Sequence, residues 1–171
     1  MQNNGFYILA TLAVVILFFG LRSVDDEGRF NPLREPAPTR IVVEEGMPKE
    51  IVVSARRDGH FIVRGELQGQ RVELLVDTGA SVTTLRESDA AKAGIRPMPR
   101  DYNRPLSTAN GEVLGASYTL PSLTIEGVEL ENLDIVVLPD DRLGGNLLGV
   151  NALDRFAERR TRDGKLTLYT E

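Results

Sequence analysis

Cysteine and tryptophan are absent from this chain of 171 residues, and it has a single histidine, His60. The absence of cysteine excludes disulfides, thiolate nucleophiles, thiolate zinc sites and iron–sulfur clusters. A single histidine excludes metal sites with two or more imidazoles, and any Ser-His-Asp triad would depend on His60. Because His60 follows Asp58-Gly59, we interpret it as a turn or strand-edge residue. The net charge of −5 argues against a nucleic-acid partner, and neither a metal nor a cofactor is expected.

Long apolar runs are also scarce, with one exception near the amino terminus. Residues 5–21 contain no charged side chain. As a helix they would span roughly 25 Å, a little less than the roughly 30 Å of a bilayer core. Snorkelling of the flanking polar side chains or slight thinning of the bilayer can compensate for the difference. A cleaved signal peptide fits less well, because no Lys or Arg precedes the run and no small-x-small cleavage site follows it. We expect residues 1–22 to be an uncleaved transmembrane anchor.

The next segment, residues 23–50, contains four prolines and an Asp-Asp-Glu run. Proline removes backbone donors and disfavours helix, so this segment is expected to be a partly extended tether. The arginines closest to the apolar run all follow it. Taken alone, the positive-inside rule would therefore place the rest of the chain in the cytoplasm. These residues are Arg22, Arg29, Arg34 and Arg40.

Residues 51–171 form the expected folded domain, in which short apolar, β-branched runs alternate with turn signals. Asn110-Gly111 is the strongest hairpin signal among them. Two short helices are expected, at 87–93 with Ser88 as a candidate cap and at 152–158. The pattern predicts a mainly β, closed or folded-over domain with one or two short helices. The expected strands include 51–53, 61–63, 72–76, 81–85, 118–120, 123–125, 135–138 and 166–169.

One of these runs ends in an acid, in the sequence Leu74-Leu75-Val76-Asp77-Thr78-Gly79-Ala80-Ser81. An aspartate directly after buried aliphatic residues is costly unless its carboxylate has a use. The threonine hydroxyl can hold the loop by hydrogen bonding, and the glycine allows backbone amides to approach the carboxylate. An ordinary strand-ending turn uses the same residue types, so the tripeptide alone does not identify a site.

A second motif lies about seventy residues downstream, where Leu147-Leu148-Gly149 is followed by Asn151. With these two motifs in this order, the chain resembles the retropepsin-like aspartic proteases from about residue 61 to 169. Each subunit of that family has one Asp-Thr-Gly loop after an apolar strand. It also has one hydrophobic-hydrophobic-Gly element ahead of a short helix, often followed one position later by Asn. The likeness is greatest to a bacterial group with one N-terminal membrane span, a tether and this domain.

The resemblance implies an aspartic endopeptidase with Asp77 as its catalytic residue. The mechanism needs two carboxylates that share one proton, and this chain has one such motif. The second Asp77 must therefore come from another copy, in a homodimer. Thr78 and Gly79 are expected to support the loop, and Ser81 is either a further support or an ordinary strand-start hydroxyl. Leu147, Leu148, Gly149 and Asn151 are expected to form the hydrophobic-hydrophobic-Gly element of the family.

The resemblance implies that the Asn110-Gly111 turn is the tip of a flap. Thr108-Ala109-Asn110-Gly111 is similar to the bacterial group, and Ala109, Asn110 and Gly111 are expected at the tip of a flap. Such a flap would close over an extended peptide segment of a protein substrate, although a plain surface hairpin gives the same pattern. Viral relatives have more glycine in their flap tips, and they carry an arginine at the position of Val150.

The resemblance implies a single-pass protein of the bacterial inner membrane with a periplasmic protease domain, in conflict with the arginine count. Two other functions remain open. One is a retropepsin-like dimerisation or peptide-binding module without turnover, and the other is a single-span membrane adaptor without a cleft. The intact Asp77-Thr78-Gly79 sequence favours the enzyme over both.

Overall fold

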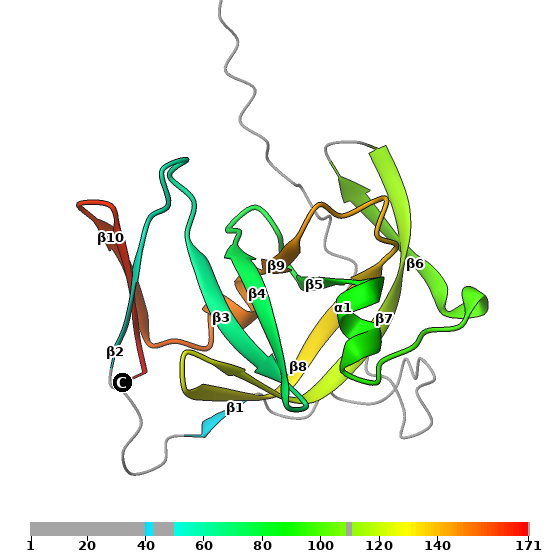
Figure 1. Ribbon diagram of the computed structural model, residues 1–171, viewed down its shortest axis with the longest axis horizontal. Coiled ribbons are helices and arrows are strands. Elements are labelled where there is room, and N and C mark those ends of the chain that lie inside the picture. Colours follow the sequence, from blue (N-terminus) through cyan, green and yellow to red (C-terminus); the bar gives the residue numbers. More distant parts are fainter. Residues whose placement is uncertain (1–39, 43–49, 109–110, 171) are drawn as a thin grey trace, which may run out of the picture.

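The computed structural model describes residues 40–42, 50–108 and 111–170, and most of them lie in β-strands (Figure 1). The expected anchor at residues 5–21 lies outside the described residues and stays a prediction. Within the described ranges, no helix has the length and apolar character needed to cross a membrane. The elements are β1 (Arg40–Val42), β2 (Glu50–Ser54), β3 (Ile62–Leu67), β4 (Gln70–Val76), β5 (Thr83–Arg86), α1 (Glu87–Lys92), the 3-10 turn η1 (Pro99–Asp101), β6 (Tyr102–Thr108), β7 (Gly111–Ile125), β8 (Val128–Leu138), β9 (Asn146–Leu148), α2 (Val150–Leu153), β10 (Glu158–Arg162) and β11 (Lys165–Tyr169).

The larger sheet closes on itself. Its strand order is β1-β8-β5-β9-β4-β3-β7-β6, and a further pairing between β7 and β8 completes a ring of strands. β1 and β6 lie outside this ring. Closure removes most free strand edges, which is how small all-β domains avoid pairing with one another. The structure therefore confirms the prediction of a mainly β, closed domain with few short helices.

The interior of the ring is a single large apolar cluster. In β3, Val63 and Leu67 are buried, whereas Arg64 and Glu66 between them are exposed, as expected for a strand with one face toward a core. Fully burying a leucine contributes roughly 1.5–3 kcal/mol. The fully buried side chains include Leu74, Leu85, Leu120, Leu133, Ile135 and Leu148.

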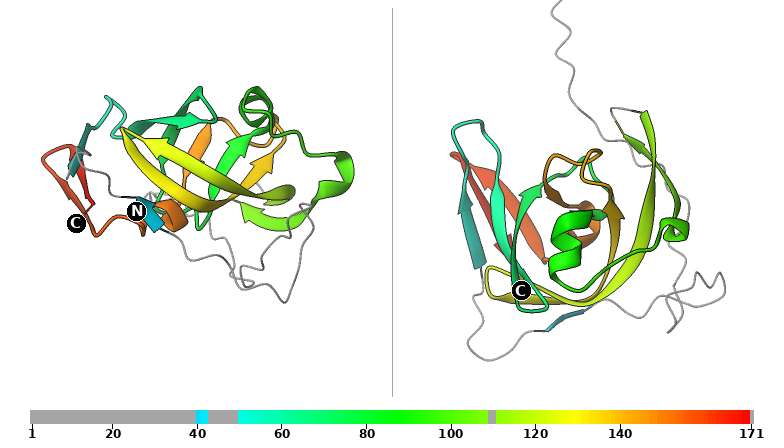
Figure 2. Two further views of the ribbon diagram at one scale, coloured as in Figure 1. Left: turned by 90° about the horizontal axis from the view of Figure 1, so that it is seen from below. Right: turned by 45° about the vertical axis from the view of Figure 1, so that its right-hand side comes forward.

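A separate sheet of three strands, in the order β10-β11-β2, joins the two ends of the domain. It lies on one side of the barrel, whereas the β6–β7 hairpin lies on the other (Figures 1 and 2). Ile51 pairs with Leu168 and Val53 with Leu166, and all four side chains are buried. β10 was not expected, because its sequence Glu-Arg-Arg-Thr-Arg is exposed throughout and has no apolar alternation.

The helices are shorter than expected. α1 begins at Glu87 as predicted, but Ser88 does not cap it: Arg86 occupies the N-cap position without a side-chain hydrogen bond. The Ser88 N–H instead donates to Asp140 Oδ1 at 3.1 Å, so a loop residue takes over the capping role. α2 has only four residues and begins directly after Gly149, two residues before the predicted start.

The segment predicted to be a tether contributes a strand to the larger sheet. β1 pairs antiparallel with the start of β8, where Ile41 lies opposite Leu130. β2, the next described strand, begins at Glu50. Residues 43–49, between these two strands, lie outside the described part of the chain.

Candidate active site

Asp77 comes directly after β4, where this strand leaves the barrel. β4 runs parallel to β9, with Val76 paired to Leu148, and the Asp77 N–H donates to the Leu148 carbonyl at 3.0 Å. Leu74 and Leu148 are fully buried, so the strand cannot slide without exposing apolar surface. The two predicted motifs, far apart in the sequence, are therefore neighbouring strands, and the position of Asp77 is fixed by both.

The loop after Asp77 directs two amides toward this residue, one to its carboxylate and one to its backbone carbonyl. The Gly79 N–H donates to Asp77 Oδ1 at 2.8 Å, and the Ala80 N–H donates to the Asp77 carbonyl at 3.3 Å. A short hydrogen bond from an amide to a carboxylate fixes the direction of the side chain. Asp77 and Gly79 are half-buried and Thr78 is exposed, so the carboxylate is rigidly held near an accessible surface.

The start of α2 is attached to the same loop through backbone hydrogen bonds. The Val150 N–H donates to the Ala80 carbonyl at 2.8 Å, and the Asn151 N–H donates to the Ser81 carbonyl at 3.3 Å. These amides belong to the first turn of the helix, where they have no partner within the helix. The loop therefore completes the helix, and the helix fixes the loop.

Gly149 has no room for a side chain. A Cβ atom on this residue would lie 2.4 Å from the Val82 carbonyl carbon, 2.6 Å from its oxygen and 2.7 Å from the Thr83 nitrogen. All three are backbone atoms, which cannot move aside as the end of a flexible side chain can. The glycine of the second motif is needed because the chain passes directly against the segment that follows the Asp77 loop.

Asn151 connects three elements through its side chain. Its Oδ1 accepts hydrogen bonds from the Thr83 N–H at 2.8 Å and from the Thr83 hydroxyl at 3.0 Å. Its Nδ2 donates to the Asp134 carbonyl at 2.6 Å. The Thr83 oxygen also accepts from the Gly149 N–H at 3.2 Å. β5, β8 and α2 are thereby held together directly behind the loop.

The sequence analysis did not identify Thr83, Asp134 or Arg155 as part of this site. Arg155 Nε donates to the Asn151 carbonyl at 2.9 Å, so a guanidinium reaches this helix although Val150 replaces the arginine of viral relatives. The spacing of four residues from Asn151 is a helical signal for that bond. Thr83 has no such signal in the sequence, because its burial and its contacts with Asn151 depend on the tertiary structure.

β6 and β7 form a hairpin in the segment that was predicted to be a flap. Thr108 pairs with Gly111, and the Thr108 hydroxyl donates to the Gly111 carbonyl at 2.8 Å. Gly111 has φ of 104°, a conformation that favours glycine. Ala109 and Asn110 lie outside the described residues, so their place at the flap tip stays a prediction.

Apolar side chains fill the space between the hairpin base and the loop. Gly115 allows β7 to lie close to β8, because a Cβ there would come within 2.3 Å of a Val136 methyl carbon. Val82 belongs to the segment that follows Asp77, so this packing connects the hairpin to the site. We call these side chains the flap-base cluster: Val82, Leu106, Val113, Val136, Leu138 and Leu143.

Beyond the flap-base cluster, the same face of the sheet becomes charged. Burial lowers the pKa of Arg104 and of Arg155, and the carboxylate of Asp134 opposes this shift at both residues. The Asp134 Oδ1 accepts a hydrogen bond from the Thr119 hydroxyl at 2.6 Å. Asp134 therefore acts on both half-buried arginines, and Asp154 acts on Arg155 in addition.

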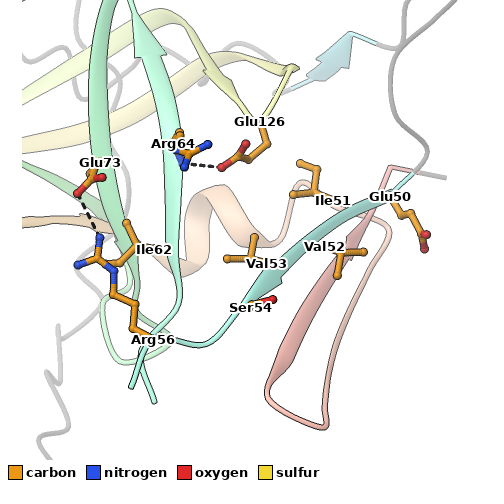
Figure 3. A pocket seen from close by; sticks show the side chains of 10 residues that line it. All are labelled: Glu50, Ile51, Val52, Val53, Ser54, Arg56, Ile62, Arg64, Glu73 and Glu126. Atoms are coloured by element: carbon orange, nitrogen blue, oxygen red, sulfur yellow. Dashed lines mark hydrogen bonds and ion pairs between the residues drawn. The ribbon is translucent and has the colours of Figure 1, made fainter. Parts of the chain in front are cut away.

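The other noteworthy residues of the sequence lie away from Asp77. His60 is exposed in its turn, where its N–H donates to Asp58 Oδ1 at 3.0 Å, as expected for a turn residue. A groove of about 480 Å³ opens between β2 and β3 and is lined largely by polar residues (Figure 3). Among the described residues, no group of three or more His, Asp or Glu side chains is arranged to hold a metal ion.

Comparison with known proteins gives related sequences and a related structure. The family described as "gag-polyprotein putative aspartyl protease" matches residues 63–155. An uncharacterized protein from the cobV 5′ region of a Sinorhizobium species is 28% identical over 166 residues, 95% of this chain and 69% of that protein. An uncharacterized protein of Rickettsia prowazekii (strain Madrid E) is 36% identical over 107 residues, 63% of this chain and 46% of that protein.

A solved structure is similar over most of the chain. The crystal structure of a retropepsin-like aspartic protease from Rickettsia conorii matches with a TM-score of 0.62 and 35% identity, over 77% of this chain and 92% of that chain. The family match includes both Asp77 and the Leu147-Leu148-Gly149 motif. Together with the closed β fold and the pairing of these two motifs, these similarities show that the chain belongs to the retropepsin-like aspartic proteases.

Proposed function

We propose that this protein is a membrane-anchored, homodimeric aspartic endopeptidase. The observation that carries the proposal is the fixed position of Asp77. Its backbone N–H donates to the Leu148 carbonyl, and its carboxylate accepts a hydrogen bond from the Gly79 N–H. A carboxylate at the end of a buried strand, half-exposed and directed by a backbone amide, suits a group that must act on a substrate in a defined geometry.

Peptide hydrolysis by this route uses two carboxylates and one water molecule. Like charges a few ångströms apart cannot both ionise, so the pair holds one proton. The ionised carboxylate takes a proton from the water as it attacks the peptide carbonyl, and the protonated one donates a hydrogen bond to the carbonyl oxygen. Loss of the anion at low pH and of the shared proton at high pH would make the rate bell-shaped in pH.

The second carboxylate would be Asp77 of another copy. A two-fold axis close to Asp77 makes the site from two identical loops, with one motif in each chain. Thr78 is exposed, which fits a side chain that contacts the other copy across that axis. Each loop would then be supported by its own α2 and by the opposite subunit.

An extended peptide is the substrate class that fits this arrangement. The β6–β7 hairpin would close over the peptide, exclude water and offer backbone hydrogen bonds to it. Residues 5–21 would anchor the chain in the bacterial inner membrane with the domain in the periplasm. Confinement to the membrane plane would raise the effective concentration of subunits and favour the dimer.

Substitution of Asp77 tests the chemistry. Asp77→Asn preserves an acceptor for the Gly79 amide, so the fold should be retained while cleavage of an unstructured protein falls by several powers of ten. Addition of excess Asp77→Asn chains to the wild-type protein should inhibit it, because mixed dimers have one carboxylate. Cleavage by Asp77→Asn at the wild-type rate would exclude the mechanism, and full activity of a strictly monomeric species would exclude the shared site.

Topology needs its own test, because Arg22, Arg29, Arg34 and Arg40 oppose a periplasmic domain. A reporter that is active only in an oxidising compartment can be fused after Glu171. The proposal expects activity of that reporter. Activity only of a cytoplasmic reporter at the same position would place the domain inside the cell and leave the proposed chemistry intact.

A further inference from the structure

Arg104 lies on the face of the flap hairpin that also carries the flap-base cluster. It is two residues from Leu106 on β6, and side chains two apart on a strand point the same way. Arg104 pairs with Gly115, which has no side chain to cover it. The cluster contains Val82 of the segment after Asp77, so this face of the hairpin is turned toward the candidate active site.

Arg104 has no carboxylate in direct contact among the described residues. Within the part of the chain that the structure describes, the hydrogen bond of Arg104 is a long one, from Nη1 to the Ser117 hydroxyl at 3.4 Å. Arg155 uses its Nε for the Asn151 carbonyl. Asp134 is the carboxylate whose charge acts on both arginines, but in that same part of the chain it forms no direct ion pair with either. It accepts from the Thr119 hydroxyl instead.

Most donors of the half-buried Arg104 guanidinium are available to a ligand. A guanidinium has five N–H donors, one of which forms the long hydrogen bond to Ser117. Among the described residues, no Arg104 nitrogen is a fully buried atom without a partner, so the other donors are accessible. A carboxylate would give these donors a charged acceptor, and the planar fork of arginine suits a carboxylate with two oxygens.

We propose that Arg104 is a specificity-determining residue that binds an acidic side chain of the peptide substrate. The inference rests on the proposed endopeptidase function. Leu106 and Arg104 are separated by about 6–7 Å along β6, which is also the repeat between alternate side chains of an extended peptide. Leu106 itself is buried, but Val113, which lies opposite it on β7, is a partly exposed member of the flap-base cluster. A peptide lying along the hairpin with an apolar side chain against Val113 would place an Asp or Glu, two residues away, against Arg104.

Peptide libraries test this inference with the full-length chain in detergent. The probes are peptides of eight residues with Glu, Gln or Lys fixed at one position at a time and the other positions mixed. Cleavage is measured with the wild-type chain, and binding is measured in parallel with the Asp77→Asn chain. The variants are Arg104→Gln, Arg104→Lys and, as a matched control, Arg100→Gln, which removes an exposed arginine paired with Asp101 in η1.

The expected result is a preference of about tenfold for Glu over Gln at one position, two residues from a position that prefers apolar side chains. This is the size of effect expected for one charge-assisted hydrogen bond. Arg104→Gln should reduce the ratio to about one, Arg104→Lys should retain part of it, and Arg100→Gln should retain it fully. Thermal unfolding of each variant checks that the fold is intact.

Two outcomes would overturn the inference: no preference for Glu in the wild-type chain, or a preference that survives in Arg104→Gln. Failure of the proposed function gives a different pattern. If no peptide is cleaved in an Asp77-dependent manner, the endopeptidase proposal fails. The binding ratios of the Asp77→Asn chain, with and without Arg104→Gln, still decide whether Arg104 recognises an acidic side chain.

Discussion

The side-chain oxygen of Asn151 accepts two hydrogen bonds from Thr83, one from the backbone N–H at 2.8 Å and one from the hydroxyl at 3.0 Å. Thr83 is buried, so neither group can turn to water if the acceptor is removed. This contact joins the strand after the Asp77 loop to the helix after the second motif. It accounts for the asparagine that follows Leu147-Leu148-Gly149 by one position.

We predict that Asn151→Ala lowers the free energy of unfolding by about 3 kcal/mol, because it leaves buried donors of Thr83 unsatisfied. Thr83→Val, which removes only the hydroxyl, should cost less. The double variant should be less destabilised than the sum of the two, since both changes remove the same contact. Denaturant unfolding of the four proteins measures this coupling, and strictly additive losses would mean that the contact contributes nothing.

Gly149→Ala should destabilise the domain by about 3 kcal/mol or more, because its Cβ would meet backbone atoms of Val82 and Thr83. Cleavage activity should fall with it, since the same segment supports the Asp77 loop. Gly144→Ala is the matched control, because nothing lies within 4 Å of a Cβ there. Equal melting temperatures for the two variants would refute the close approach at Gly149.

Ionisation of Tyr102 should lower the free energy of unfolding of the domain at alkaline pH. Burial, with the nearby carboxylate of Glu87, raises the pKa of Tyr102 to about 12. The neutral phenol is the form that fits the fold, so its contribution to stability is complete below pH 10 and is lost as the pH rises toward 12. Tyr102→Phe should remove this dependence. It should also cost little at neutral pH, because the hydroxyl is buried without a hydrogen-bond partner among the described residues.

Unfolding measured between pH 9 and 12 distinguishes the two proteins. Tyr118→Phe, a change of an exposed tyrosine on β7, is the control and should retain the alkaline dependence because Tyr102 is still present. If the wild-type protein and Tyr102→Phe lose stability in parallel over this range, the dependence has another origin.

Asn146→Asp should be strongly destabilising at neutral pH. The Asn146 side chain accepts from the Arg86 N–H at 2.8 Å and donates to Asp89 Oδ2 at 2.9 Å. The hydrogen bond from Lys92 is the largest cause of the lowered pKa of Asp89, so its carboxylate is charged at pH 7. The variant would bring two carboxylates together in a site where Asn146 is buried.

The size and direction of this effect can be checked at two pH values. We expect a loss of about 3 kcal/mol at pH 7 and a smaller loss near pH 4, where one of the two carboxyl groups takes up a proton. Adding Asp89→Asn should restore much of the stability at pH 7. A loss that is the same at both pH values would show that charge repulsion is not its cause.

The fold could be predicted from the sequence wherever one face of a strand is buried. Residues 72–76 and 135–138 are apolar runs of strand length, and both lie within strands of the barrel. β10 gives no such signal, because all five of its residues are exposed and β11 is its one strand partner in the described part of the chain. β1 was missed for a related reason, since three residues are too few to show an alternation.

The candidate site could be predicted only as far as its motifs extend. The Asp77 and Leu148 segments were identified because a known family has both motifs in this order, but their pairing as neighbouring strands was not predicted. Thr83 and Arg104 follow from tertiary contacts that have no local pattern, whereas Arg155 has the helical spacing of four residues from Asn151. The backbone of Val82 explains the need for Gly149, and nothing in the residues adjacent to Gly149 in the sequence indicates that approach.

The distance along the chain between Thr83 and Asn151, 68 residues, has a consequence for biosynthesis. A growing polypeptide that has emerged only as far as β8 already contains the complete Asp77 loop. It lacks the Leu148 carbonyl and the Val150 amide, which are the external partners of that loop. Domains fold as units during translation, so the carboxylate reaches its fixed position only after the segment through Val150 has left the ribosome. Under the proposed endopeptidase function, chains that still lack this segment would not cleave neighbouring proteins.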